Sequence, residues 1–78
     1  MIISCFRNAG MIPFVQTNIP QFSMTMETAN NLWGRSLNPW NKLRSTGGSS
    51  GGEGGMIALK CSLLGFGADI GGSIRIPS

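Results

Sequence analysis

Apolar residues in the first half of the chain occur in short groups rather than in one long periodic stretch. Residues 1–9 are compatible with a short helix, which Gly10 would end as a C-terminal cap. The apolar group within residues 12–15 indicates a short buried strand, because turn-forming residues follow it directly. Residues 22–32 have apolar positions without a period, so this stretch is expected to be a loop with a helical turn.

Glycines interrupt the pattern in the second half, where ten of the twelve lie from Gly47 onward. Ser50 is followed three residues later by Glu53, which is typical of a capping box and predicts a helix from about Gly51 to Cys61. That helix would contain four glycines, each costing about 1 kcal/mol relative to alanine. We therefore expect the glycines to let another part of the chain pack closely against its first turns.

Turn signals and one further apolar group complete the pattern. Residues 38–41, with the sequence NPWN, predict a turn, and Trp40 is expected to anchor that turn to the core. Residues 63–68 indicate a second short buried strand, interrupted by two glycines. Residues 69–75 then form a turn that presents Ser73.

The composition suits a piece of a larger domain better than an independent one. With 78 residues the chain would bury only about 60% of its unfolded surface. Its 12 glycines and 4 prolines raise the entropy cost of folding or end elements. Its hydrophobic content of 41% is nevertheless too high for a disordered tail.

Several classes of protein are excluded by charge and by the lack of long apolar runs. No apolar run approaches the roughly 20 residues of a membrane-spanning helix, and Arg7 interrupts the stretch in which a signal peptide would be apolar. Cys5 and Cys61 are too few for a disulfide framework, so we expect an intracellular, reducing compartment. The net charge of +3 comes from scattered basic residues, so we expect no nucleic-acid partner.

The chain contains no histidine, which limits the chemistry it can support. Catalysis by Ser-His-Asp or Cys-His groups is excluded, and so are most zinc sites. Lysine is the remaining candidate for a base, because burial or a nearby cation can lower its pKa.

Two glycine-flanked serines, Ser49 and Ser73, admit three interpretations. Gly-rich loops at helix N-termini can bind phosphate, but neither loop has the GxxxxGK[ST] or GxGxxG pattern. Gly-Ser stretches are often flexible linkers, although the isoleucines around Ser73 are unusual for a linker. Ser73 could also be a nucleophile, because consecutive backbone N–H groups before it could hold a developing oxyanion.

Motifs in both halves resemble those of one enzyme family. Residues 47–52 read GGSSGG and residues 69–77 read DIGGSIRIP. Together these segments are similar to the core of the amidase signature family. Residues 13–21 and 38–41 resemble its fatty-acid amide hydrolase branch. The resemblance implies an α/β fold, in which this chain would be a slice of an α/β/α sandwich with a mixed twisted sheet, and residues 1–78 would be a fragment of a single amidase domain.

The resemblance also implies roles for individual residues. Ser73 would be the nucleophile of a Ser-Ser-Lys triad, and Ser49 would relay protons to the lysine through a hydroxyl that follows a cis peptide bond. Asp69 and Arg75 would brace the turn as an ion pair, unless they are only a solvated surface pair, and Ser50 would be a helix cap. The oxyanion hole would consist of the N–H groups of Ile70, Gly71, Gly72 and Ser73.

The sequence departs from the family pattern at several positions. The catalytic lysine belongs to a segment upstream of all residues present here, and neither Lys42 nor Lys60 is well placed to replace it. Thr46 stands where proline is usual, and Ala68 stands where a hydroxyl residue is common. These departures put full activity in doubt even in a complete protein.

The function implied by the resemblance is hydrolysis of a small-molecule carboxylic amide, with lipid amides as the first candidates, without metal or organic cofactor. We expect the isolated chain to be inactive because its triad lacks the lysine. The alternative is an inactive fragment with a packing or interaction role. For the full-length parent, the resemblance leaves open a cytoplasmic or membrane-associated location and a homodimer.

Overall fold

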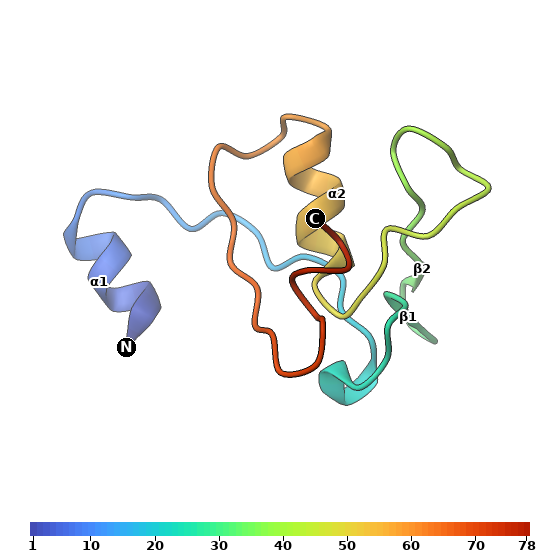
Figure 1. Cartoon of the computed structure of the whole chain (residues 1–78). Helices are drawn as coiled ribbons and strands as arrows, with labels where there is room; N and C mark the ends of the chain where they lie inside the picture. The colour runs from blue at the N-terminus through green and yellow to red at the C-terminus, as the bar shows by residue number, and fades with distance from the viewer.

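The computed structural model describes residues 1–78, which form two short helices and one small hairpin (Figure 1). The helices are α1 (Ile2–Asn8) and α2 (Gly51–Ala58). Strands β1 (Ala29–Asn30) and β2 (Gly34–Arg35) pair antiparallel, and a single turn of 3-10 helix covers Gln21–Ser23. These elements are compatible with the α/β class, but the mixed sheet and helical layers of a full sandwich do not form within this chain.

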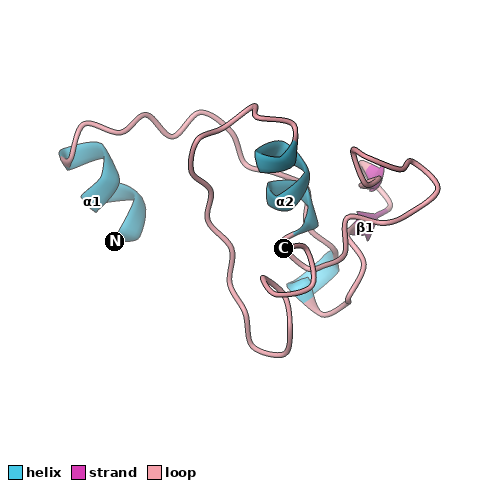
Figure 2. Ribbon diagram, turned by 45° about the horizontal axis from the view of Figure 1, so that its top comes forward, coloured by secondary structure: helices cyan, strands magenta, loops and turns pink.

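Helix α1 stands to one side of the molecule and is joined to the rest by an extended segment (Figure 2). It ends next to Gly10, as predicted, where φ of +87° places the backbone in the left-handed region that glycine tolerates. The ring of Phe6 packs against Phe66 with a centroid separation of 4.5 Å. This aromatic pair is the visible contact between α1 and the second half of the chain. Neither α1 nor α2 is long enough to cross a lipid bilayer.

The hairpin is held by polar side chains rather than by apolar packing. Asn30 accepts the N–H groups of Leu32 and Trp33 through Oδ1 at 3.0 and 2.8 Å, which closes the turn between β1 and β2. Arg35 forms an ion pair with Glu27 at 2.8 Å. The 3-10 segment at Gln21–Ser23 meets the helical turn expected within residues 22–32 only in part, because Phe22 and Ser23 both have a left-handed φ of +55°.

The first turn of α2 is in close contact with two distant segments, as its glycines led us to expect. A Cβ built on Gly52 would clash with the backbone of Asn18, and one on Gly51 would clash with the hydroxyls of Thr28 and Thr46. The helix ends at Ala58, three residues earlier than predicted. Its glycines are therefore needed for close approach, at a cost in helix propensity.

Three expectations about apolar segments were wrong. Residues 12–15 and 63–68 form no strands, and their side chains are exposed, with Ile12 at 84% and Leu63 at 104%. A strand requires a neighbouring strand for its backbone hydrogen bonds, and no part of this chain pairs with either segment. Trp40 does not anchor its turn, because it is 79% exposed. The turn is held instead by Asn38, whose Oδ1 accepts the N–H groups of Trp40 and Asn41.

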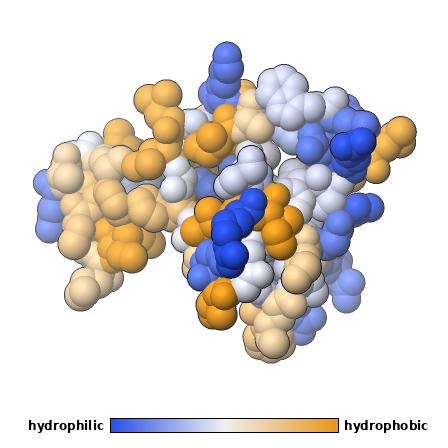
Figure 3. Space-filling model, in the orientation of Figure 1, coloured by the Kyte–Doolittle hydropathy of each residue, from blue (hydrophilic) through white to orange (hydrophobic).

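The chain has no buried apolar core. Only 7 of 78 residues are buried, and none of them is a large hydrophobic residue. The accessible surface is 6184 Å², whereas a compact monomer of this size would expose about 4,600 Å². Figure 3 shows hydrophobic side chains gathered over α1 and in patches elsewhere on the surface. The apolar residues that would form a core in a larger domain therefore face solvent here.

Candidate functional site

The best-packed part of the chain surrounds residues 47–50, which we call the serine loop. Ser49 is 4% exposed, Thr46 is 8% exposed and Thr28 is fully buried, and the neighbouring Gly48 and Gly51 are also buried. Most of the buried residues therefore cluster around the loop that carries Ser49.

The serine loop lies against the turn that carries Ser73. The N–H of Ser50 donates to the carbonyl oxygen of Ser73 at 3.0 Å, although the two residues are 23 positions apart. The Gly48–Ser49 peptide bond is cis, the geometry that the family resemblance implied for this position. The fold thus brings the two glycine-flanked serine segments side by side.

The hydroxyls of Ser49 and Ser73 form no hydrogen bond within the chain. Ser49 is almost fully buried, yet no buried side-chain oxygen is left without a partner, so the small area that Ser49 exposes includes its hydroxyl. Ser73 is half-buried. Both hydroxyls therefore remain available to a group from outside this chain.

Ser50 begins α2 but does not cap it through its side chain. The predicted capping box is wrong, because Ser50 and Glu53 do not form the reciprocal hydrogen bonds that define it. The N–H of Gly51 donates instead to Thr28 Oγ1 at 2.9 Å, and the carboxylate of Glu53 accepts the hydroxyl of Thr17 at 2.8 Å. The hydroxyl of Ser50 is consequently not used by the helix, and Ser50 lines a hollow of about 460 Å³ beside α2.

Asp69 organises the turn that presents Ser73. Its carboxylate accepts the backbone N–H groups of Gly72, Ile74 and Arg75 at 2.8, 2.9 and 3.1 Å. The Arg75 guanidinium donates to both carboxylate oxygens, at 2.8 and 3.1 Å. Asp69 is 16% exposed whereas Arg75 is 73% exposed, so the ion pair expected from the sequence has its carboxylate under the turn and its cation in solvent.

These contacts change which backbone groups are free near Ser73. The N–H of Gly72, one of the four expected in the oxyanion hole, is already bound to Asp69. The N–H groups of Ile70, Gly71 and Ser73 donate to no acceptor in the chain. Three of the four N–H groups are therefore without an acceptor in the chain, and the fourth orients the turn.

The pKa of Asp69 lies far below its ordinary value, chiefly because the Arg75 side chain donates to it and then because the backbone N–H groups of Arg75 and Ile74 do so. A depressed carboxyl pKa adds stability that is fully present above the unfolded-state value and is lost as pH falls toward the folded-state value. We predict that the Asp69 carboxyl keeps its ¹³C chemical shift throughout pH about 5 to 3, where ordinary aspartates titrate.

The titration is simple to follow because Asp69 is the sole aspartate of the chain. The matched variant Arg75→Gln removes the largest contribution and should move the titration back toward the ordinary range. An ordinary Asp69 titration in the unaltered chain would contradict the braced turn.

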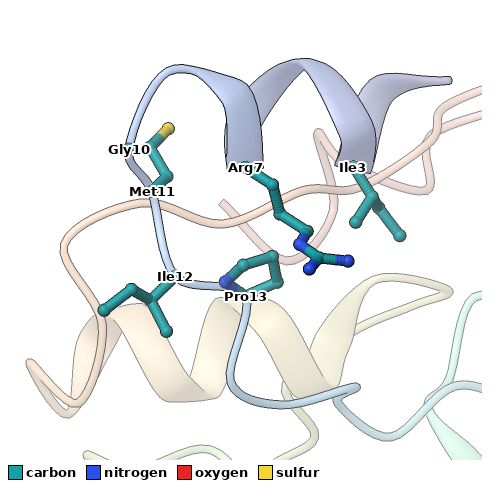
Figure 4. Close-up of a pocket in the computed structure, with 6 residues that line it drawn as sticks. All are labelled: Ile3, Arg7, Gly10, Met11, Ile12 and Pro13. Atoms are coloured by element: carbon teal, nitrogen blue, oxygen red, sulfur yellow. The ribbon is translucent and has the colours of Figure 1, made fainter.

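The two lysines weighed as bases are exposed, and their ammonium groups form no hydrogen bond or ion pair within the chain. Lys60 follows the C-terminal end of α2, whereas the serine loop precedes its N-terminal end. A surface hollow of about 570 Å³ lies between α1 and the segment that leaves it (Figure 4). None of the candidate site residues lines that hollow.

Sequence reasoning did not single out Thr28, a buried residue that contacts the serine loop. Its hydroxyl lies within hydrogen-bond distance of Gly47, Ser49 and Gly51. No local motif marks it, because these partners lie 19 to 23 residues further along the chain.

Known proteins share sequence similarity with this chain over its whole length. The chain is 49% identical over its full length to fatty-acid amide hydrolase 1 of Sus scrofa, 47% to an acetamidase of Emericella nidulans and 50% to the vitamin D3 hydroxylase-associated protein of Gallus gallus. It spans only 14–17% of the length of these relatives. The sequence model of the Amidase family matches residues 1–78. The family model matches every residue of the chain, and the two serine segments lie next to each other. The chain therefore belongs to the amidase family.

Proposed function

We propose that this chain is the serine-bearing segment of an amide hydrolase, in which Ser73 is the nucleophile and Ser49 relays its proton. The observation that carries the proposal is the hydrogen bond from Ser50 N–H to Ser73 O, since it joins the serine loop to the turn presenting Ser73. The free hydroxyls of both serines and the free N–H groups beside Ser73 support it further.

In the proposed reaction, Ser73 Oγ attacks the carbonyl carbon of a carboxylic amide. The proton of Ser73 passes to Ser49 Oγ, whose own proton passes to a neutral lysine amine outside this chain. The N–H groups of Ile70, Gly71 and Ser73 stabilise the oxyanion of the tetrahedral intermediate. The C–N bond then breaks, and the leaving amine takes a proton back through Ser49. Water hydrolyses the acyl-enzyme by the same proton transfers in reverse.

The family assignment extends to hydrolysis of small-molecule amides, and the acyl group is a further proposal. We favour a lipid amide because residues 13–21 and 38–41 resemble the fatty-acid branch. The named relatives include both a fatty-acid amide hydrolase and acetamidases, so the match itself does not separate long from short acyl chains.

We also propose that the chain is part of one larger amidase domain. It exposes about 1,600 Å² more surface than a compact monomer of its size, which is about twice the roughly 800 Å² that one partner buries in a standard protein interface. The exposed apolar residues include Leu63, Phe66 and Ile70 around the candidate site. The remainder of the domain would cover them and supply the lysine.

The proposal can be tested by transplanting the chain. Residues 1–78 replace the 78 residues that they match in Sus scrofa fatty-acid amide hydrolase 1, and we call the product the chimera. The chimera should hydrolyse a long-chain primary amide and react with a fluorophosphonate probe. A folded chimera without either activity would favour the alternative function, which is an inactive interaction fragment. The exposed apolar surface of the chain supports that alternative.

The isolated 78-residue chain should not react with the same fluorophosphonate. A serine hydroxyl without a base is a weak nucleophile, and both lysines of the chain are exposed and bonded to neither serine. Mass spectrometry of the intact chain after exposure to the probe measures the adduct. Stoichiometric labelling of Ser73 would show that the chain needs no external base.

A further inference from the structure

Thr28 is the only large side chain that is completely buried, and its hydroxyl sits at the centre of the serine loop. Thr28 Oγ1 lies 2.8 Å from the carbonyl oxygen of Gly47 and 3.2 Å from that of Ser49. It also accepts the N–H of Gly51 at 2.9 Å. One hydroxyl therefore contacts the backbone before Ser49, at Ser49 and after Ser50.

A threonine hydroxyl has one proton and two acceptor lone pairs. The N–H of Gly51 occupies one lone pair, and the proton is directed to the Gly47 carbonyl or shared with that of Ser49. These two carbonyls lie on either side of the Gly48–Ser49 peptide. The hydroxyl thus sets the path of the backbone through Ser49 from both sides.

Thr28 is itself held in place by the hairpin. Its carbonyl oxygen accepts the N–H of Ser36 at 2.8 Å, and the neighbouring Glu27 pairs with Arg35. The Glu27 backbone also lies very close to Gly48, since a Cβ added to Gly48 would lie 2.7 Å from the Glu27 nitrogen. The segment that carries Thr28 is therefore bonded to the hairpin on one side and lies directly against the serine loop on the other.

From this geometry we propose that Thr28 is a positioning residue, which sets the place of the Ser49 hydroxyl relative to Ser73. The inference rests on the proposed function, because it needs Ser49 to transfer protons. Thr28 would not touch substrate. Its contribution would appear in the rate of the chemical steps, since small displacements of a relay group slow proton transfer strongly.

The test compares Thr28→Val, Thr28→Ser and Thr25→Val in the chimera. Valine keeps the shape and removes the hydroxyl, so kcat per fluorophosphonate-titrated site should fall by about 10- to 100-fold with KM changed by less than about twofold. Thr28→Ser restores the hydroxyl and should recover most of kcat. Thr25 is the control, because its hydroxyl also bonds to a backbone carbonyl, that of Glu27, but does not contact the serine loop.

A double-mutant cycle separates positioning of Ser49 from general stability. In a Ser49→Ala background, Thr28→Val should lower the residual kcat no further, because a residue that acts through Ser49 has nothing left to position. An equal loss in both backgrounds, or full kcat in Thr28→Val, would overturn the inference. If Thr28→Val yields no soluble protein, Thr28→Cys provides the same comparison with a weakly hydrogen-bonding thiol.

The two proposals fail in different ways. Wild-type activity of Ser49→Ala in the chimera would overturn the proposed function and, with it, the role of Thr28. A strong loss in Ser49→Ala together with an unaffected Thr28→Val would overturn the inference about Thr28 alone.

Discussion

Replacing Ser73 by alanine in the chimera is expected to lower amide hydrolysis by about three orders of magnitude or more. Ser73 Oγ is the atom that would form the acyl bond, and the free N–H groups of Ile70 and Gly71 beside it cannot replace a nucleophile. Hydrolysis of a long-chain primary amide and covalent labelling by fluorophosphonate measure the effect. Both should disappear together.

The matched control is Ser4→Ala. Ser4 lies on the exposed helix α1 and forms no hydrogen bond through its side chain, so its removal should leave hydrolysis within about twofold. Ser49→Ala should fall between the two, because water can replace a proton relay in part. Fluorophosphonate labelling that persists in Ser73→Ala would identify a different nucleophile.

Replacing Gly48 by alanine is expected to disrupt the site through packing. A Cβ at this position would lie 2.7 Å from both the nitrogen and the carbonyl carbon of Glu27, and 2.9 Å from its oxygen. These are backbone atoms held by the hairpin, so the serine loop must move instead. Overpacking of this kind costs about 1–3 kcal/mol of stability. The displaced Ser49 should lower kcat by about 100-fold.

Gly55→Ala is the control for this substitution, because a Cβ on Gly55 would meet only Thr46 Cγ2 at an ordinary 3.5 Å. Within α2, alanine should also gain up to about 1 kcal/mol of helix propensity. Thermal unfolding and kcat of the two chimera variants provide the comparison. If Gly48→Ala unfolds at the temperature of the unaltered chimera and keeps its kcat, the serine loop is not packed as described.

The local motifs were sufficient to identify the two serine segments and the turn over residues 69–75, and they placed the start of α2 correctly although the capping box used to predict it does not form. Each depends on residues that are close in sequence. Asp69 and its N–H donors lie within six positions, and Gly10 ends α1 through its own backbone conformation. Short-range hydrogen bonds and backbone preferences of this kind can be inferred without knowing the rest of the fold.

The wrong expectations all concerned residues whose state depends on distant partners. Residues 12–15 and 63–68 have the apolar character of strands, but a strand exists only where another strand pairs with it. Trp40 was expected to be buried because it is large and apolar, yet the chain offers no core to receive it. Apolar character indicates that a side chain is more stable when buried, whereas burial itself requires other segments that pack around it.

The serine loop likewise combines features that its local sequence determines with features that depend on distant segments. Its glycines and serines are local features of residues 47–52, and the resemblance to a family of amide hydrolases was apparent from these residues together with residues 69–77. Only the tertiary structure showed that Thr28 caps α2 in place of Ser50, that Asp69 occupies the Gly72 N–H, and that Ser50 bonds to Ser73. Every residue except proline carries the same backbone donor and acceptor, so the partner of each is decided by which segments meet in space.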